Sequence, residues 1–217
     1  LSLKAVSGLE HWVMWRNKQA LIPYLLLVLA LAGGILWHES RLVPGLGRTV
    51  TTGIAQVGGP FRLTDHTGKT VTEQDFHGRY MLIYFGYSFC PDVCPTTLGV
   101  MAEALQKLGS DSRRVVPIFI TIDPARDTPK VLADYMKAFG PQFVGLTGSP
   151  AAIKEVDKES RVYAVQRPLD PSKGNAGGYG MDHSSVLYLM GPTGKLVSFY
   201  DEAISPDDLA KDLRQKI

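Results

Sequence analysis

The sequence has few cysteines: its 217 residues include only Cys90 and Cys94. This count excludes a disulfide-rich scaffold, and a single bridge between these two positions would close too short a loop to stabilise a domain of this size much. The two thiols are therefore better explained by chemistry than by structural cross-linking. They could close as a disulfide or hold one metal ion, and the cysteines alone leave both interpretations open.

An excess of charge of either sign is also missing. The formal net charge is +2, and it comes from residues 1–18, which carry three basic side chains and one acidic one. The rest of the chain is balanced, so no basic face for a nucleic acid is indicated. With 217 residues, of which 45% are hydrophobic and 20% charged, the chain is long enough for one domain with a hydrophobic core and one additional segment.

Charged residues are absent from 19–37, and this segment is almost wholly apolar. Its length is close to the roughly 20 residues that cross a bilayer. Basic residues precede it, and Tyr24 and Trp37 lie where interfacial aromatics belong, which predicts an N-terminus in the cytoplasm. We therefore expect a cytoplasmic tail at 1–18 and a transmembrane anchor at 19–38.

A cleaved signal peptide is the alternative for the same segment, because Ala30-Leu31-Ala32 resembles a small-residue cleavage site. In either case the remainder of the chain is expected to be exported. Residues 39–59 are rich in glycine, threonine and valine without clear periodicity, which predicts a tether. Residues 60–217 are expected to form the folded domain.

Both cysteines lie between a predicted strand and a predicted helix. Residues 80–85 are aromatic and aliphatic, which is typical of a buried strand. Residues 96–108 carry apolar side chains at the spacing of a helix face. The unpaired N–H groups and the dipole at a helix start favour thiolate over thiol, so we expect two reactive sulfurs that converge on one point.

Strands and helices alternate along the rest of the chain. The expected elements are a hairpin at 61–72, strands at 115–122, 143–146, 162–166, 184–190 and 195–200, and helices at 129–139, 150–160 and after Ser205. Thr128, Ser149 and Ser205 are the predicted N-caps. Pro117 indicates that the first part of its strand is not fully paired, and the glycine-rich residues 167–182 predict a long loop.

This order of elements indicates an α/β fold. Strand–helix alternation that ends in an antiparallel pair predicts a thioredoxin-like mixed central sheet with helices on both faces, preceded by one N-terminal transmembrane helix. The turn between the cysteine strand and its helix lies where that fold has its active site.

His183 follows the predicted loop, and a flexible arm could carry its imidazole to the cysteines, although a lone histidine at a strand edge is also an ordinary structural residue. Two thiolates and one imidazole form a soft trigonal set that suits copper, whereas structural zinc usually takes a fourth protein ligand. Asp123, at a strand end, could orient His183 or serve only as a turn residue. Met181 is more simply a loop residue than a weak metal ligand.

Other polar groups are expected to be structural. His66 and His77 lie in predicted loops and are expected to face solvent. Asp92 is interpreted as a solvated turn carboxylate. Arg126 and Asp127 are expected to pair or cap locally.

Three segments resemble the Sco (SenC) family of copper-binding, thioredoxin-like proteins: FGYSFCPDVCPTTL, TIDPARDTP and GYGMDHSSVLYLMGPTGK. The resemblance extends from about Phe61 onward and implies Cys90, Cys94 and His183 as ligands of copper, as Cu(I) or Cu(II). It also implies maturation of the CuA centre in subunit II of cytochrome c oxidase, as a copper donor, a reductant of its cysteines, or both.

The same resemblance sets the expected partners and location. The partners would be that subunit, another exported copper chaperone or thiol reductant, and the membrane through the N-terminal helix. The protein would span the inner membrane of a bacterium once, with its C-terminal domain in the periplasm.

Two functions from different classes follow from the cysteines. The first is a metallochaperone that passes copper on by ligand exchange. The second is a thiol–disulfide oxidoreductase in which Cys90 and Cys94 are catalytic. His183 discriminates between them, because disulfide exchange does not need it. A thiol peroxidase is not supported, since the cysteine turn has no threonine-to-cysteine motif, and copper delivery ranks first.

Overall fold

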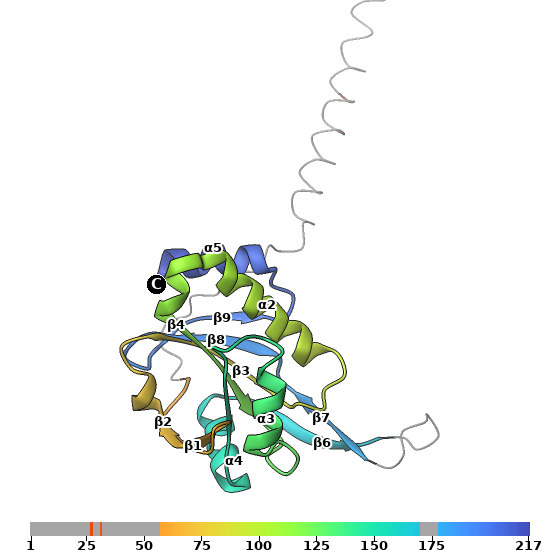
Figure 1. Ribbon diagram of the computed structural model, residues 1–217. Coiled ribbons are helices and arrows are strands. Elements are labelled where there is room, and N and C mark those ends of the chain that lie inside the picture. The colour runs from red at the N-terminus through yellow and green to blue at the C-terminus, as the bar shows by residue number, and fades with distance from the viewer. Residues whose placement is uncertain (1–26, 28–30, 32–56, 170–177) are drawn as a thin grey trace, which may run out of the picture. The chain divides into compact units, whose positions relative to one another are not determined.

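The computed structural model describes residues 57–169 and 178–217, together with Leu27 and Leu31. Apart from these two leucines, the described residues belong to one unit, Gly47–Ile217, built on a seven-stranded sheet with strand order β2-β1-β5-β4-β3-β8-β9 (Figure 1). Its strands are β1 (Arg62–Asp65), β2 (Thr70–Thr72), β3 (Tyr80–Gly86), β4 (Val115–Thr121), β5 (Val144–Thr147), β8 (Val186–Met190) and β9 (Leu196–Asp201). The helices are η1 (Glu73–Phe76), α2 (Val93–Leu108), η2 (Gly109–Arg114), α3 (Pro129–Met136), α4 (Pro150–Glu159) and α5 (Pro206–Lys216).

The centre of the sheet consists of β3 and β4, which pair in parallel along their whole length. Nearly every residue in them is buried, as the continuous apolar runs predict. Strand β4 pairs with β5 only from Ile118 to Ile120, so Pro117 lies where β4 has a single neighbour. The prediction from Pro117 is confirmed, because a residue without an N–H is tolerated where one side of the strand is unpaired.

Helices cover both faces of the sheet, as predicted. Tyr84 and Phe119 are register partners and so share one face. The Tyr84 hydroxyl meets α2, and the Phe119 ring packs against Tyr135 of α3. Helix α5 lies alongside α2 (Figure 1). On the opposite face, Ile83 lines a cavity of about 250 Å³ together with Val156 of α4.

The helix starts follow the predicted N-caps. Thr128, Ser149 and Ser205 each accept a hydrogen bond from a backbone N–H three residues ahead, and a proline follows each cap. The end of α3 differs from the prediction, because the helix stops at Met136 rather than near Phe139. The apolar spacing continues past this point, but the backbone already turns toward Gly140, whose φ is +127°.

The predicted loop at 167–182 is partly wrong. Strand β6 (Ala164–Pro168) and strand β7 (Tyr179–His183) pair as an antiparallel hairpin and form a sheet of their own. Strand β6 overlaps the strand predicted at 162–166, so the error concerns β7, which falls in the predicted loop. Glycine and proline in this stretch masked β7, whose partner strand is the mostly exposed β6 outside the main sheet.

The two loop histidines behave differently. His77 is exposed, as predicted. His66 is half-buried, and its Nδ1 accepts a hydrogen bond from the backbone N–H of Gly145 at 3.1 Å. The prediction of a solvated His66 is therefore wrong, because β1 brings the end of the first hairpin next to β5.

The predicted tail at 1–18, the anchor at 19–38 and nearly all of the tether at 39–59 lie outside the described residues. Within the part of the chain that the structure describes, no helix is both long and apolar enough to cross a bilayer. The division of the chain into tail, anchor, tether and the domain at 60–217 stays a prediction.

Candidate metal centre

The turn between β3 and α2 places both cysteines at one end of the central sheet. Cys94 lies in the first turn of α2 and is fully buried, whereas Cys90 lies in the turn before it and is half-buried. The backbone N–H of Cys94 donates to the Cys90 Sγ at 3.4 Å. Both cysteines are free thiols. The predicted convergence of the sulfurs on one point is therefore borne out.

A glycine lets Cys94 pack against the end of the strand. A Cβ on Gly86 would lie 2.9 Å from the Cys94 Sγ and 3.0 Å from the rings of Tyr84 and Phe119. Such distances are too short for any side chain. Because position 86 has no side chain, the Cys94 sulfur can lie directly against the end of β3.

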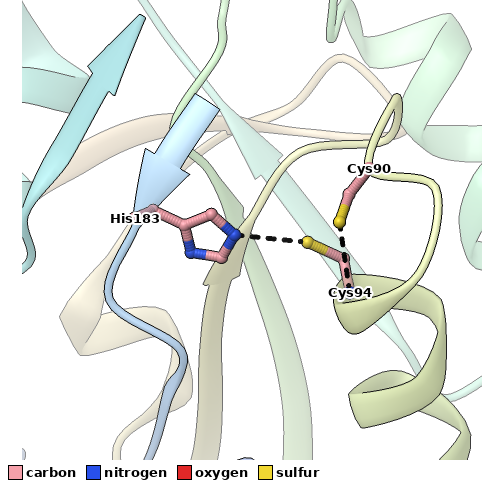
Figure 2. Close-up of side chains that lie close together, drawn as sticks. All are labelled: Cys90, Cys94 and His183. Atoms are coloured by element: carbon pink, nitrogen blue, oxygen red, sulfur yellow. Dashed lines mark hydrogen bonds between the residues drawn. The ribbon is translucent and has the colours of Figure 1, made fainter. Parts of the chain in front are cut away.

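His183, at the end of β7, points its imidazole at the cysteines (Figure 2). Its Nε2 lies 3.5 Å from the Cys94 Sγ, and its Nδ1 lies 3.1 Å from the Ser184 carbonyl oxygen. A carbonyl can only accept, so Nδ1 carries the proton and Nε2 presents a lone pair. The rings of Tyr84 and Tyr87 meet the imidazole edge-on at 6.4 and 5.9 Å and fix its plane.

The three side chains form a set with the spacing of metal ligands. The two sulfurs and one ring nitrogen all lie within 4.8 Å of one another. With metal–sulfur bonds of about 2.3 Å, two ligands of a trigonal ion are separated by roughly 4 Å, so the set needs only a small contraction to bind one ion. Among the described residues, no other histidine, cysteine or acidic residue joins this group.

Burial decides the charge of the site. It raises the pKa of Cys94 to about 12 and lowers the pKa of His183 below its ordinary value. The prediction that the helix start favours a thiolate is therefore wrong for Cys94, because desolvation outweighs the helix dipole. A neutral imidazole and a thiol that a bound cation can deprotonate are the states a soft metal requires.

A buried carboxylate holds the cysteine turn in place. Asp127 accepts hydrogen bonds from the Ser88 N–H at 3.0 Å, from the Ser88 hydroxyl, and from the Thr121 hydroxyl at 2.6 Å. The prediction that Arg126 and Asp127 pair or cap locally is confirmed for Arg126, which pairs with Asp123, and wrong for Asp127, whose partners are Ser88 and Thr121. Burial raises the pKa of Asp127, and its acceptor atoms tie the turn after β3 to the end of β4.

Asp123 is not part of the group of ligand atoms. The Asp123 carboxylate is buried, pairs with Arg126 and accepts the Tyr179 hydroxyl at 2.9 Å, so it does not orient His183 directly. Met181 lies on β7 and packs against the core. Asp92 is exposed and makes no capping hydrogen bond, as expected for a turn carboxylate.

Sequence patterns missed the aromatic and polar groups around the site. Tyr84 resembled an ordinary member of a buried strand, Tyr87 belonged to the turn before the cysteines, and Asp127 resembled a loop carboxylate. The one available signal was position, because all three lie within the segments that carry the cysteines or follow the adjacent strand.

The chain is similar in sequence to known proteins of one family. The sequence profile of the SCO1/SenC family matches residues 49–217. Protein sco1 of Schizosaccharomyces pombe is 45% identical over 163 residues, which are 74% of this chain and 61% of that protein. Protein SenC of Rhodobacter capsulatus is 38% identical over 80% of this chain and 76% of its own length.

Solved structures agree with these matches. ScoI of Bradyrhizobium japonicum, solved with copper bound, is 43% identical and superposes with a TM-score of 0.68 over 74% of this chain and 99% of that one. BsSco, described as a member of the Sco family of cytochrome c oxidase assembly proteins, is 26% identical with a TM-score of 0.57, over 77% of this chain and 96% of that one. The chain spans about half to three-fifths of the length of several curated relatives.

Proposed function

Because the chain belongs to the SCO1/SenC family, we propose that it is a copper metallochaperone that takes part in cytochrome c oxidase assembly. The observation that carries the proposal is the convergence of Cys90, Cys94 and His183, whose ligand atoms lie within 4.8 Å of one another. The copper-bound structure of B. japonicum ScoI, a relative with 43% identity, supports copper as the metal.

The chemistry of the donor set favours copper over zinc. Two sulfurs and one imidazole nitrogen form a soft, three-coordinate set, which suits Cu(I) and also accommodates Cu(II). Copper is here the cargo, so the site must release it as well as bind it. A set of three ligands, one of them the half-buried Cys90, leaves room for a ligand of an acceptor protein to enter. Both cysteines lose their protons on binding and regain them on release.

We extend the proposal to the acceptor and the location. The acceptor would be the CuA site of cytochrome c oxidase subunit II, and the protein would serve that site as a copper donor, a reductant of its cysteines, or both. The domain would face the periplasm of a bacterium and be held at the inner membrane by the apolar segment at 19–38. The charge-free run of that segment supports this location.

A second candidate is a thiol–disulfide oxidoreductase, which the unequal burial of the cysteines favours. The accessible Cys90 thiolate would attack a partner disulfide, forming a mixed disulfide and releasing one partner thiolate. Cys94 would then attack the Cys90 sulfur, which forms the Cys90–Cys94 disulfide and releases the second partner thiolate. Two electrons pass to the partner, and His183 takes no part in the exchange.

His183→Ala separates the two functions, with His77→Ala as the matched control because His77 is exposed and lies in a distant turn. Copper affinity and the rate of disulfide exchange are measured in the same anaerobic samples. The metallochaperone predicts tight binding of one copper by the wild type and the control, and lost affinity with intact exchange in His183→Ala. Equally weak copper binding in all three proteins would refute it and favour the oxidoreductase.

A further inference from the structure

The hairpin that carries His183 is separate from the main sheet. Strands β6 and β7 hydrogen-bond to each other and form a two-stranded sheet of their own (Figure 1). At its base, Ser184 N–H donates to the Tyr163 carbonyl, and Tyr163 N–H donates to the Ser184 hydroxyl. The first residues of β7 need other contacts if the hairpin is to hold the imidazole at the cysteines.

Arg126 supplies such contacts at the start of β7. Its Nη1 donates to the Tyr179 carbonyl oxygen at 2.9 Å, and its guanidinium carbon lies 3.8 Å from the centre of the Tyr179 ring. Its Nε donates to Asp123, and the Tyr179 hydroxyl donates to the other carboxylate oxygen at 2.9 Å. One buried carboxylate thus fixes both the guanidinium and the ring stacked on it.

The same guanidinium also faces the cysteine turn. It lies 4.8 Å from the centre of the Phe89 ring and 5.6 Å from that of Tyr87. Phe89 directly precedes Cys90, and the Tyr87 ring meets the His183 imidazole edge-on at 5.9 Å. Cation–π contacts of this kind, together with the hydrogen bonds above, join the two segments that carry the ligands.

We propose that Arg126 is a positioning residue of the metal centre, which holds the β6–β7 hairpin against the cysteine turn and so keeps His183 within reach of Cys90 and Cys94. The inference rests on the proposed copper function and adds a specific residue to it. Arg126 contacts none of the ligand atoms. By holding the hairpin in place, Arg126 lowers the conformational entropy that the hairpin loses when the metal binds. Its removal therefore weakens copper binding only through His183.

A double-mutant cycle isolates this role. Copper affinity is measured anaerobically for the wild type, Arg126→Gln, His183→Ala and the double variant, with thiol titration and an unfolding curve for each. Loss of a group hydrogen-bonded directly to a ligand typically costs about 10–100-fold in metal affinity; because Arg126 acts on His183 through the hairpin, we expect a loss at the lower end, about tenfold, in Arg126→Gln. In the His183→Ala background the same change should cost less than about threefold, because there is no imidazole left to position.

Arg167→Gln is the matched control. Arg167 belongs to the same hairpin and pairs with Asp182, next to His183, but its side chain is 62% exposed. Its loss should leave copper affinity within about twofold of the wild type, because exposed pairs contribute little. The Arg126→Gln protein could fail to fold, because the buried Asp123 carboxylate would lose its charged partner. Arg126→Lys then replaces it as the test variant: it keeps the positive charge but loses the planar guanidinium, which stacks on Tyr179 and donates to two partners, so it should weaken copper binding in the same way.

The outcomes separate this inference from the proposed function. Equal losses from Arg126→Gln with and without His183 would mean that Arg126 acts on the cysteines or on the whole domain, and no loss would mean that it has no role. Either result overturns the inference while the copper function stands. If the wild type binds copper no better than His183→Ala, the proposed function fails and the inference fails with it.

Discussion

Replacing Gly86 by alanine tests how tightly the structure packs around Cys94. The added Cβ would lie 2.9 Å from the Cys94 Sγ and 3.0 Å from two aromatic rings of the central sheet. Three neighbours would have to move at once, and all of them are buried. The backbone φ of Gly86 is not in the left-handed region, so the cost of the change lies in packing alone.

The size of the effect follows from that overpacking. Inserting one carbon into a well-packed interior costs about 1–3 kcal/mol. For a domain of this size, that lowers Tm by roughly 2–12 °C. Because one of the displaced atoms is the Cys94 sulfur, copper affinity should fall together with stability.

Gly99→Ala is the matched control within the same segment. Gly99 lies in the middle of α2, is exposed, and has no atom within 4 Å of an added Cβ. An alanine there should stabilise the domain by about 0.5–1 kcal/mol, because it lowers the entropy cost of forming the helix.

Chemical denaturation of the wild type and both variants, followed by an anaerobic copper titration, measures both effects. A Gly86→Ala protein as stable as the wild type, with unchanged copper affinity, would show that the sulfur is not held by close packing. An equal loss in Gly99→Ala would instead attribute the effect to glycine replacement in general.

Three further predictions concern groups outside the ligand set. Asp127→Ala should destabilise the domain by about 2 kcal/mol or more, since Ser88 and Thr121 lose a buried acceptor; unchanged unfolding in urea would contradict this. Burial raises the pKa of Asp157 from 3.8 to about 7, and among the described residues its Oδ1 has no hydrogen-bond partner. The folded state therefore binds this proton more tightly than the unfolded state, and the wild type should lose stability relative to Asp157→Asn as pH rises from about 4 to 7; a pH-independent difference in unfolding free energy would refute it. Ser205→Ala should cost about 1 kcal/mol through loss of the α5 N-cap, as measured by thermal unfolding.

Local patterns were enough to predict most of the fold. The apolar runs of β3 and β4, the caps at Thr128, Ser149 and Ser205, and the strand–turn–helix around the cysteines all depend on neighbours a few residues apart. Strand β6 overlaps the strand predicted at 162–166, but β7 was predicted as part of a loop, because it lies outside the main sheet in a glycine-rich stretch. A strand of low hydrophobicity forms because a partner strand lies beside it. The residue pattern within that one strand does not show where the partner is.

The candidate site divides in the same way. Its chemistry could be predicted from residue types, since the two cysteines four positions apart and His183 are what a soft metal requires. Folding brings His183, 89 positions along the chain from Cys94, to within 3.5 Å of the Cys94 sulfur. It also decided the protonation of Cys94, whose burial outweighs the helix start. Residue type and local spacing are properties of the chain, whereas desolvation and distant contacts exist only once the chain has packed.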